Sequence, residues 1–429
     1  MKKILIEGGN KLDGEVKISG AKNASLPILM STILIENGES AILNVPAVAD
    51  VNTTLELLSH LGAEVKIDNA IDNTKVFTVK AKNINTIKAP YNIVGKMRAS
   101  FWVLGSLLGR FGEAKVSLPG GCAIGPRPCD IYIDALKKMQ IDTKIEDGYV
   151  IAKAKKNGKP QGANIELRLA SVGATPNTSM AAVLAEGETI IKNAAKEPEI
   201  VDLANFLNLC GAKIDGAGTD TIKIDGVKKL EPMQYKVMGD RIESFGYIIA
   251  SALTKGELIL SGMDFFNTMQ KPIEILEKIG INLEKIDNHR VKIQTNKILK
   301  PTNVITDFYP GFPTDCQSQI MALLGLIKGT SNIDETIFEN RLMHVPELVR
   351  MGANIVIEEN KAIVNGVEKY HGAEVKATDI RGGMCMILAG LAAEGKTKIN
   401  NIHHLERGYE NLIEKFESCG ANIKIIEEE

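Results

Sequence analysis

The apolar and polar positions of this chain repeat one short local pattern. An amphipathic stretch is followed by a glycine, then by a small or apolar residue and a run typical of a β-strand, as at Leu61-Gly62-Ala63 and Met351-Gly352-Ala353. The further copies are centred on Gly211, Gly280 and Gly420, and on Gln140 in a copy that lacks the glycine. Because a left-handed glycine commonly ends a helix, each copy predicts a helix followed by a strand.

The copies recur with a period of roughly 70 residues, which indicates a repeated structural unit. Each unit also contains an earlier helix that is apolar nearly all round. We predict these helices over residues 24–35, 97–108, 178–185, 242–252, 317–327 and 383–393. Since a helix that is apolar on every side must be buried on every side, strands should pack around these helices.

The number of units exceeds what one hydrophobic core usually holds, so we predict two pseudo-symmetric α/β domains of three units each. The boundary lies near Gly239, between the third and fourth units. Residues 22–238 form the first domain and residues 239–429 the second. From the pattern alone, residues 1–21 could complete either one.

Composition narrows the class of protein. The chain has 429 residues, 51 Lys and Arg against 53 Asp and Glu, and 44% hydrophobic residues. This balance excludes disordered and fibrous classes and argues against a nucleic-acid protein that works through bulk positive charge. No apolar run is long enough for a signal peptide or a membrane span. The six cysteines form no Cys-x-x-Cys pair, so we expect neither disulfides nor a metal site, and a cytoplasmic location.

Polar residues gather in the loops that precede the helices, and most of the scarce arginines lie in or beside these loops. The residues concerned are Lys22, Asn23, Arg98, Arg127, Arg168, Ser171, Arg241, Asp315, Arg341, Arg381 and Arg407. Helix N-termini attract anions, and arginine forks bind phosphate and carboxylate. The pattern therefore predicts a substrate with several negative charges, bound in a cleft between the domains.

Several polar residues near the predicted helix starts also have a purely structural interpretation. Asp50, Asp240 and Asp315 stand where N-caps stand. The doublets Glu339/Arg341 and Asp379/Arg381 are typical of ion pairs that brace a loop. Ser171 and Thr175 are capping candidates as well, and His344, His403 and His404 lack the company that a metal ligand needs.

Residues 119–128 read Pro-Gly-Gly-Cys-Ala-Ile-Gly-Pro-Arg-Pro, a composition that fits a loop or lid and neither a helix nor a central strand. Cys122 in this loop lies five residues before Arg127. A neighbouring cation lowers the pKa of a thiol, so Cys122 is a candidate acid or nucleophile.

Several motifs in collinear order resemble the UDP-N-acetylglucosamine enolpyruvyl transferases. They are Gly-Ala-Lys22-Asn23, Gly-Gly-Cys122-Ala-Ile-Gly-Pro-Arg127-Pro, Glu-Pro-Glu-Ile-Val-Asp202, Phe-Pro-Thr-Asp315, Phe-Glu-Asn-Arg341 and Glu-Arg407-Gly-Tyr-Glu. The resemblance implies two inside-out α/β barrel domains that close over a cleft, with residues 1–21 completing the second domain. It also implies transfer of the enolpyruvyl group of phosphoenolpyruvate to the sugar 3-hydroxyl, the first committed step of peptidoglycan synthesis for the cell wall.

The resemblance assigns roles residue by residue. Cys122 resembles the general acid, which can also form a covalent adduct with phosphoenolpyruvate and which fosfomycin alkylates. Lys22, Arg127 and Arg407 resemble the residues that hold phosphoenolpyruvate, with Arg381 nearby, and Asp315 resembles the base at the 3-hydroxyl. The remaining substrate-binding positions implied are Asn23, Arg98, Pro128, Cys129, Asp130, Ile131, Ser171, Val172, Gly173, Ile337 and Arg341. Leu169 departs from the family, which often has a lysine there. No metal or organic cofactor is expected.

Three alternatives stay open. The first is the sister enzyme that uses shikimate 3-phosphate as acceptor and lacks the Gly-Gly-Cys loop. The second is an inactive homologue that binds a nucleotide sugar and regulates. The third is a redox protein that uses Cys122 and Cys129, which Pro126, Arg127 and Pro128 between them disfavour.

Overall fold

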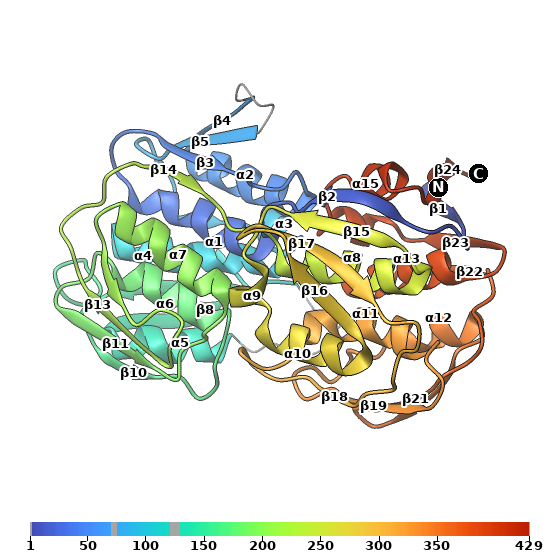
Figure 1. Cartoon of the computed structure of the whole chain (residues 1–429). Coiled ribbons are helices and arrows are strands. Elements are labelled where there is room, and N and C mark those ends of the chain that lie inside the picture. The colour runs from blue at the N-terminus through green and yellow to red at the C-terminus, as the bar shows by residue number, and fades with distance from the viewer. Residues whose placement is uncertain (1, 70–74, 121–128, 429) are drawn as a thin grey trace. The chain divides into compact units, whose positions relative to one another are not determined.

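The computed structural model describes residues 2–69, 75–120 and 129–428. These residues form two compact units (Figure 1). One contains residues 20–120 and 129–238, and the other contains residues 2–19 and 239–428. Each unit has its own core of buried apolar side chains, so each is described by itself.

The predicted all-apolar helices are present, and they form the interior of each unit. They are α1 (Lys22–Ser31), α4 (Val103–Phe111) and α6 (Ala174–Ala182) in one unit, and α8 (Arg241–Thr254), α11 (Thr314–Leu324) and α13 (Ile380–Ala392) in the other. Every residue of α6 is buried. Short 3₁₀ turns adjoin two of these helices, η1 (Thr32–Leu34) after α1 and η2 (Arg98–Trp102) before α4.

The amphipathic helices follow in the predicted places. They are α2 (Ala49–Leu61), α5 (Asp130–Lys138), α7 (Pro198–Leu209), α10 (Gln270–Ile279), α12 (Val345–Arg350) and α15 (Leu412–Ser418), with short helices α3 (Tyr91–Val94), α9 (Phe265–Thr268) and α14 (His403–Glu406). The repeated glycines that follow them have positive φ, as at Gly62 (φ 105°) and Gly280 (φ 108°). Gln140, which replaces the glycine after α5, is also left-handed (φ 57°). The left-handed backbone conformation of the repeat is therefore present at Gln140, although the residue there is not glycine.

The described strands form six four-stranded sheets, three in each unit. In the unit with residues 20–238 the orders are β14-β3-β5-β4, β6-β7-β9-β8 and β10-β11-β13-β12. The strands are β3 (Ser40–Leu43), β4 (Glu64–Asn69), β5 (Lys75–Lys80), β6 (Lys88–Ala89), β7 (Glu113–Ser117), β8 (Ile141–Glu146), β9 (Tyr149–Ala154), β10 (Asn164–Glu166), β11 (Glu188–Lys192), β12 (Lys213–Asp215), β13 (Thr221–Asp225) and β14 (Gln234–Lys236).

The other unit has the orders β2-β15-β17-β16, β18-β19-β21-β20 and β22-β23-β1-β24. Its strands are β1 (Lys2–Glu7), β2 (Asp13–Lys17), β15 (Glu257–Ser261), β16 (Ile281–Lys285), β17 (Arg290–Thr295), β18 (Val304–Ile305), β19 (Thr330–Asp334), β20 (Asn354–Glu358), β21 (Lys361–Asn365), β22 (Glu374–Lys376), β23 (Lys396–Asn400) and β24 (Asn422–Glu427). In all six sheets, the first strand of the order pairs in parallel with the second. The second, third and fourth strands then pair with one another in antiparallel fashion.

Strands from distant parts of the sequence close each unit. The N-terminal strand β1 pairs with β23 and β24, so the two ends of the chain lie on adjoining strands (Figure 1). The next strand, β2, pairs in parallel with β15. In the same way β14, which ends its unit, pairs in parallel with β3, which begins it. Each unit is thus a ring of three repeats.

The inner helices approach one another closely at their N-terminal ends. A Cβ at Gly105 of α4 would lie 2.1 Å from the carbonyl oxygen of Asn177 in α6, so only glycine fits there. Asn177 donates from Nδ2 to the carbonyl oxygen of Phe101 at 3.1 Å. These contacts tie the start of α6 to the turn before α4, and so fix the loops that carry the candidate site residues.

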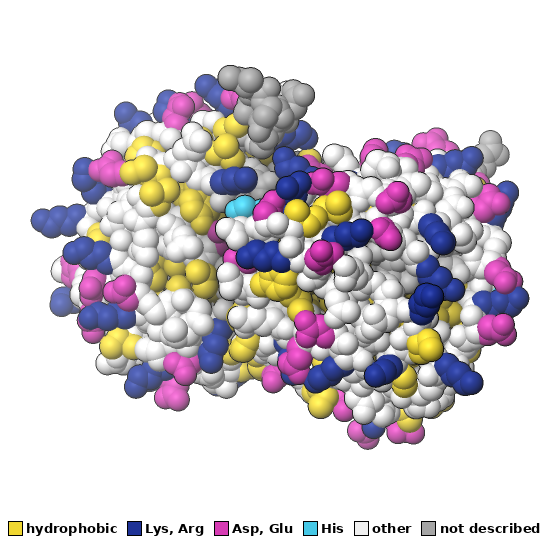
Figure 2. Space-filling model, viewed as in Figure 1, with side chains coloured by type: hydrophobic (Ala, Val, Ile, Leu, Met, Phe, Trp, Pro, Cys, Tyr) yellow, Lys and Arg dark blue, Asp and Glu magenta, His cyan; other side chains and the backbone are white. Residues whose placement is uncertain are grey.

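The visible surface mixes both signs of charge. In Figure 2, Lys and Arg side chains alternate with Asp and Glu over this face, in keeping with the formal net charge of −2. Among the described helices, none is long and apolar enough to cross a membrane.

Candidate functional site

The first candidate residue, Lys22, begins the buried helix α1. Its ammonium group lies 3.2 Å from the Asp50 carboxylate in the first turn of α2, and both side chains are buried. A cation at a helix N-terminus is unfavourable by itself, because the helix dipole is positive there. Asp50 offsets this charge, and an anionic ligand at the same place would do so too.

Arg98 lies at the start of η2 and close to the beginning of α5. Burial raises the pKa of the Cys129 thiol, against the opposing charge of Arg98. At the same helix start, the Asp130 carboxylate pairs with Arg168 at 2.5 Å, where both side chains are about half exposed. A thiol with a raised pKa is a poor nucleophile at neutral pH, which argues against the redox alternative.

The third helix start in this unit holds Ser171, Val172 and Gly173. Ser171 Oγ accepts a hydrogen bond from the backbone N–H of Ala174, the first residue of α6, at 3.1 Å. The carbonyl oxygen of Gly173 accepts a hydrogen bond from Trp102 Nε1 at 2.9 Å. A Cβ at Gly173 would lie 1.8 Å from the Tyr132 hydroxyl, so this position requires glycine. Val172 remains exposed beside this braced turn.

In the other unit, Asp315 is the centre of an ion-pair network. It lies in the first turn of α11 and its side chain is 31% exposed. Arg341 Nη2 contacts its Oδ1 at 2.6 Å, and Arg381 Nε contacts the same oxygen at 3.3 Å. Both arginine side chains are buried, with 4% and 6% exposed. The arrangement holds a partly accessible carboxylate in one orientation between two buried cations.

Asp379 joins this network from the start of α13. Its carboxylate caps the helix by accepting hydrogen bonds from the N–H groups of Arg381 and Gly382, and lies 3.7 Å from Arg341 Nη1. Burial alone would raise the pKa of Asp379, but the charge of Arg341 and the backbone N–H groups hold that pKa below its ordinary value. Burial lowers the pKa of the neighbouring His344 to about 4, so this imidazole is neutral.

Arg381 has a second polar partner in Tyr409. Its Nη1 donates to the Tyr409 hydroxyl at 3.2 Å, and Gln319 Nε2 donates to the same hydroxyl at 3.3 Å. Burial by itself would lower the pKa of Arg381, but Asp315, Tyr409 and Asp240 outweigh it and hold that pKa well above its ordinary value. The starts of α8, α11 and α13 therefore share one electrostatic neighbourhood.

Arg407 and Ile337 stand in loops of the same unit. Arg407 directly follows α14, and burial, His403 and Arg407 together lower the pKa of His404. The N–H groups of Ile337 and Phe338 both donate to Glu335 Oε1, at 2.9 and 3.1 Å, which fixes that turn.

Cys122, Arg127 and Pro128 fall outside the residues that the structure describes. Asn23 is half-buried beside Lys22, Ile131 is buried in α5, and Leu169 is 37% exposed. Within the described ranges, no group of three or more His, Cys, Asp or Glu side chains is placed to hold a metal ion.

The structural interpretations of the acidic residues were partly wrong. Asp240 does cap its helix, accepting from the N–H groups of Ile242 and Glu243. Asp50 and Asp315 instead stand inside the first turn and pair with cations from other segments. The Arg341 and Arg381 guanidinium groups both pair with Asp315, which is neither of the acids that stand next to them in the sequence.

Sequence reasoning missed three residues of these networks: Trp102, Gln319 and Tyr409. Tyr409 belongs to the Arg407-Gly-Tyr motif, but the motif does not predict the contact of Tyr409 with Arg381. Trp102 is the single tryptophan of the chain, a signal that was available.

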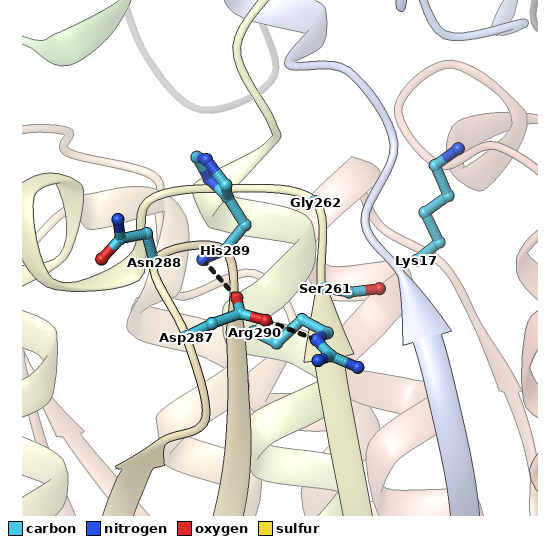
Figure 3. Close-up of a pocket in the computed structure, with 7 residues that line it drawn as sticks. All are labelled: Lys17, Ser261, Gly262, Asp287, Asn288, His289 and Arg290. Atoms are coloured by element: carbon cyan, nitrogen blue, oxygen red, sulfur yellow. Dashed lines mark hydrogen bonds and ion pairs between the residues drawn. The ribbon is translucent and has the colours of Figure 1, made fainter.

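A hollow of about 510 Å³ lies apart from these residues, at the ends of β2, β15 and β17 (Figure 3). Two of its charged side chains already pair, since Arg290 Nε donates to Asp287 at 2.7 Å. Lys17 and His289 are exposed and point away from this pair (Figure 3). None of the predicted site residues lines the hollow, and we assign it no function.

Comparison with known proteins gives a consistent result. A model of the EPSP synthase (3-phosphoshikimate 1-carboxyvinyltransferase) family matches residues 6–416. UDP-N-acetylglucosamine 1-carboxyvinyltransferases from Trichlorobacter lovleyi and Geotalea uraniireducens are each 48% identical to the chain, and the alignments cover 100% of both partners. The crystal structure of the enolpyruvyl transferase NikO from Streptomyces tendae superimposes with a TM-score of 0.88 at 24% identity, covering 99% of this chain and 98% of that one.

Proposed function

We propose that the chain, which belongs to the EPSP synthase family and within it to the UDP-N-acetylglucosamine 1-carboxyvinyltransferases, is an active enolpyruvyl transferase. It transfers the enolpyruvyl group of phosphoenolpyruvate to the 3-hydroxyl of UDP-N-acetylglucosamine and releases phosphate. The observation that carries the proposal is the similarity to those relatives over the whole chain. Each compact unit is then one enolpyruvyl-transferase domain, one of residues 22–238 and the other of residues 1–21 with 239–429.

The chemistry divides into an addition and an elimination. The 3-hydroxyl oxygen bonds to C2 of phosphoenolpyruvate while its proton leaves, and C3 takes up a proton to become a methyl group. The tetrahedral adduct then loses a proton from C3 and expels phosphate, which restores the double bond. One acid and one base suffice for both steps. We assign the acid to Cys122 and the base to Asp315.

The geometry around Asp315 fits this assignment. Its carboxylate is the most accessible member of a buried network, and Arg341 and Arg381 fix the direction in which its oxygens point. A base held in one orientation reaches a hydroxyl without losing side-chain freedom on binding. Lys22, Arg127 and Arg407 would hold the phosphate and carboxylate of phosphoenolpyruvate, and Arg98 and the turn at residues 171–173 would contact the nucleotide sugar.

The unpaired thiols agree with a cytoplasmic enzyme of cell wall synthesis. The five described cysteines are Cys129, Cys210, Cys316, Cys385 and Cys419, and each is free. Free thiols persist in a reducing compartment.

The direct test measures phosphate release from phosphoenolpyruvate with each of two acceptors. We expect release with UDP-N-acetylglucosamine and none with shikimate 3-phosphate. Release with shikimate 3-phosphate alone would move the chain to the acceptor named by the family model. Tight binding of the nucleotide sugar without any phosphate release would instead support the regulatory homologue.

The acid is tested by variants at Cys122. We expect Cys122→Ser to abolish turnover, because a hydroxyl is a far weaker acid than a thiol. Cys122→Asp should retain turnover and lose alkylation by fosfomycin, which needs the sulfur. Cys419→Ala is the matched control. Cys419 is buried directly after α15, so this variant should still be alkylated by fosfomycin. Alkylation of the Asp variant would refute the assignment.

A further inference from the structure

We infer that Tyr409 is the positioning residue for Arg381, and that its hydroxyl sets the direction in which the guanidinium meets phosphoenolpyruvate. The inference rests on the proposed function, because the role of Arg381 near phosphoenolpyruvate belongs to that proposal. It adds a residue to which no role was assigned.

The guanidinium of Arg381 is held at two of its edges. Nε and Nη2 face the carboxylate of Asp315, at 3.3 Å from Oδ1 and 3.4 Å from Oδ2. On the other side, Nη1 donates to the Tyr409 hydroxyl at 3.2 Å. A guanidinium is planar and its five N–H donors point in fixed directions. Fixing two edges therefore fixes where the remaining N–H groups point.

Tyr409 can act as such a support because it is itself buried and hydrogen-bonded. The residue is buried, with 4% of its surface exposed, and its hydroxyl also accepts a hydrogen bond from Gln319 Nε2 at 3.3 Å. The Arg381 guanidinium lies 5.6 Å from the centre of the Tyr409 ring. Burial raises the pKa of Tyr409 to about 12, so the phenol is neutral at physiological pH.

The backbone of Arg381 is fixed separately, which isolates the effect of the hydroxyl. Ser318 Oγ donates to the carbonyl oxygen of Arg381 at 3.0 Å, and Asp379 caps the helix at its N–H. Removing the Tyr409 hydroxyl should therefore leave the helix in place and remove one hydrogen bond each from the Arg381 guanidinium and the Gln319 amide. Phenylalanine keeps the ring and its packing, and removes the one acceptor.

The matched control is Tyr370→Phe. Tyr370 is buried in the same unit, and its hydroxyl donates to the carbonyl oxygen of Ala322 at 2.9 Å. Ala322 lies near the C-terminal end of α11, whereas Asp315 lies at the N-terminal end. Tyr370→Phe thus loses one buried hydrogen bond of a tyrosine hydroxyl and Tyr409→Phe loses two, and only Tyr409→Phe affects an arginine of the site.

The experiment compares steady-state kinetics of both variants with the wild type. We expect Tyr409→Phe to raise the KM for phosphoenolpyruvate and to lower kcat/KM for it by about tenfold, the effect of losing a hydrogen bond to a charged group. The KM for UDP-N-acetylglucosamine should stay within about twofold, and Tyr370→Phe should match the wild type for both substrates. Equal kinetics of the two variants would overturn the inference.

A double-mutant cycle separates positioning from structural damage. In an Arg381→Lys background the fork is absent, so adding Tyr409→Phe should change kcat/KM by less than about twofold. A further tenfold loss in that background would show that Tyr409 acts independently of Arg381, against the inference.

One readout does not need activity. In a crystal structure of Tyr409→Phe, the Arg381 guanidinium should leave its present contacts with Asp315 or occupy more than one orientation. An unmoved guanidinium would overturn the inference whatever the wild-type enzyme does. If the wild type releases no phosphate while Arg381 does move, the proposed function fails and the structural dependence of Arg381 on Tyr409 stands.

Discussion

Replacing Arg341 by methionine tests the ion-pair network in the unit that contains Asp315. Methionine keeps most of the length of the side chain and removes its charge and its N–H groups. Arg341 is 4% exposed and contacts Asp315 at 2.6 Å and Asp379 at 3.7 Å. The variant leaves Asp315 paired with Arg381, and leaves Asp379 with the backbone N–H groups of Arg381 and Gly382.

The magnitude follows from burial. Removing one partner of a fully buried ion pair costs about 3–5 kcal/mol, because the other charge is left uncompensated. Asp315 is 31% exposed, so water screens part of this loss and we expect about 2–3 kcal/mol. For a unit of this size that corresponds to a fall in Tm of about 5–10 °C.

The pH dependence gives the prediction its sign. In the wild type the pKa of Asp379 lies below its ordinary value, so its contribution to stability is present above about pH 4 and is lost only as pH falls through that lower pKa. Without Arg341, burial raises this pKa. The variant then gains stability relative to the wild type as pH falls from 7 towards 4, and the difference in Tm narrows.

Calorimetry at pH 7 and at about pH 4.5 measures both effects. Arg350→Met is the control, because the Arg350 side chain is 60% exposed and lies 3.9 Å from Glu347. Its hydrogen bonds to the carbonyl oxygen of Glu374 are also exposed, so its Tm should change by less than about 2 °C. Equal shifts in the two variants, or a shift in Arg341→Met that does not depend on pH, would refute the reasoning.

Three further predictions concern stability. Gln140→Gly should raise the free energy of unfolding by about 0.5–1 kcal/mol, since Gln140 has φ 57° where the other repeats have glycine; lower stability in urea titration would contradict this. Tyr247→Phe should raise it by about 1 kcal/mol, because the buried Tyr247 hydroxyl has no hydrogen-bond partner within the described residues; a lower Tm would point to a partner. Burial raises the pKa of Asp202 to about 6, so the wild type loses stability as pH rises from about 4 to 6 and the buried carboxyl ionises. Over that range the free energy of unfolding of Asp202→Asn should rise relative to that of the wild type by up to about 3 kcal/mol. A difference that stays constant with pH would contradict the raised pKa.

The repeat could be predicted because its signals are local. A helix that must be buried needs apolar residues on every side, and a helix that must stop before a strand needs a left-handed residue, so both appear within one segment of sequence. Even the exception at Gln140 adopts the left-handed conformation, since the neighbouring helix and strand require it.

The partners of the charged residues could not be predicted in the same way. Asp315, Arg341 and Arg381 come from three different segments of the chain, and both guanidinium groups reach Asp315, which is far from each of them in the sequence. Tyr409 supports Arg381 from 28 residues away in the sequence. Nothing in a local pattern reports such distances.

The sequence by itself therefore determined the repeated α/β units, the buried helices and the family of the chain. Only the tertiary structure decided with which strands β1 and β2 pair, and which carboxylate each guanidinium meets. The physical reason is one of range. Helix periodicity and left-handed turns are set by neighbours along the chain, whereas sheet closure and ion pairing are set by groups that become neighbours only when the repeats close into a ring.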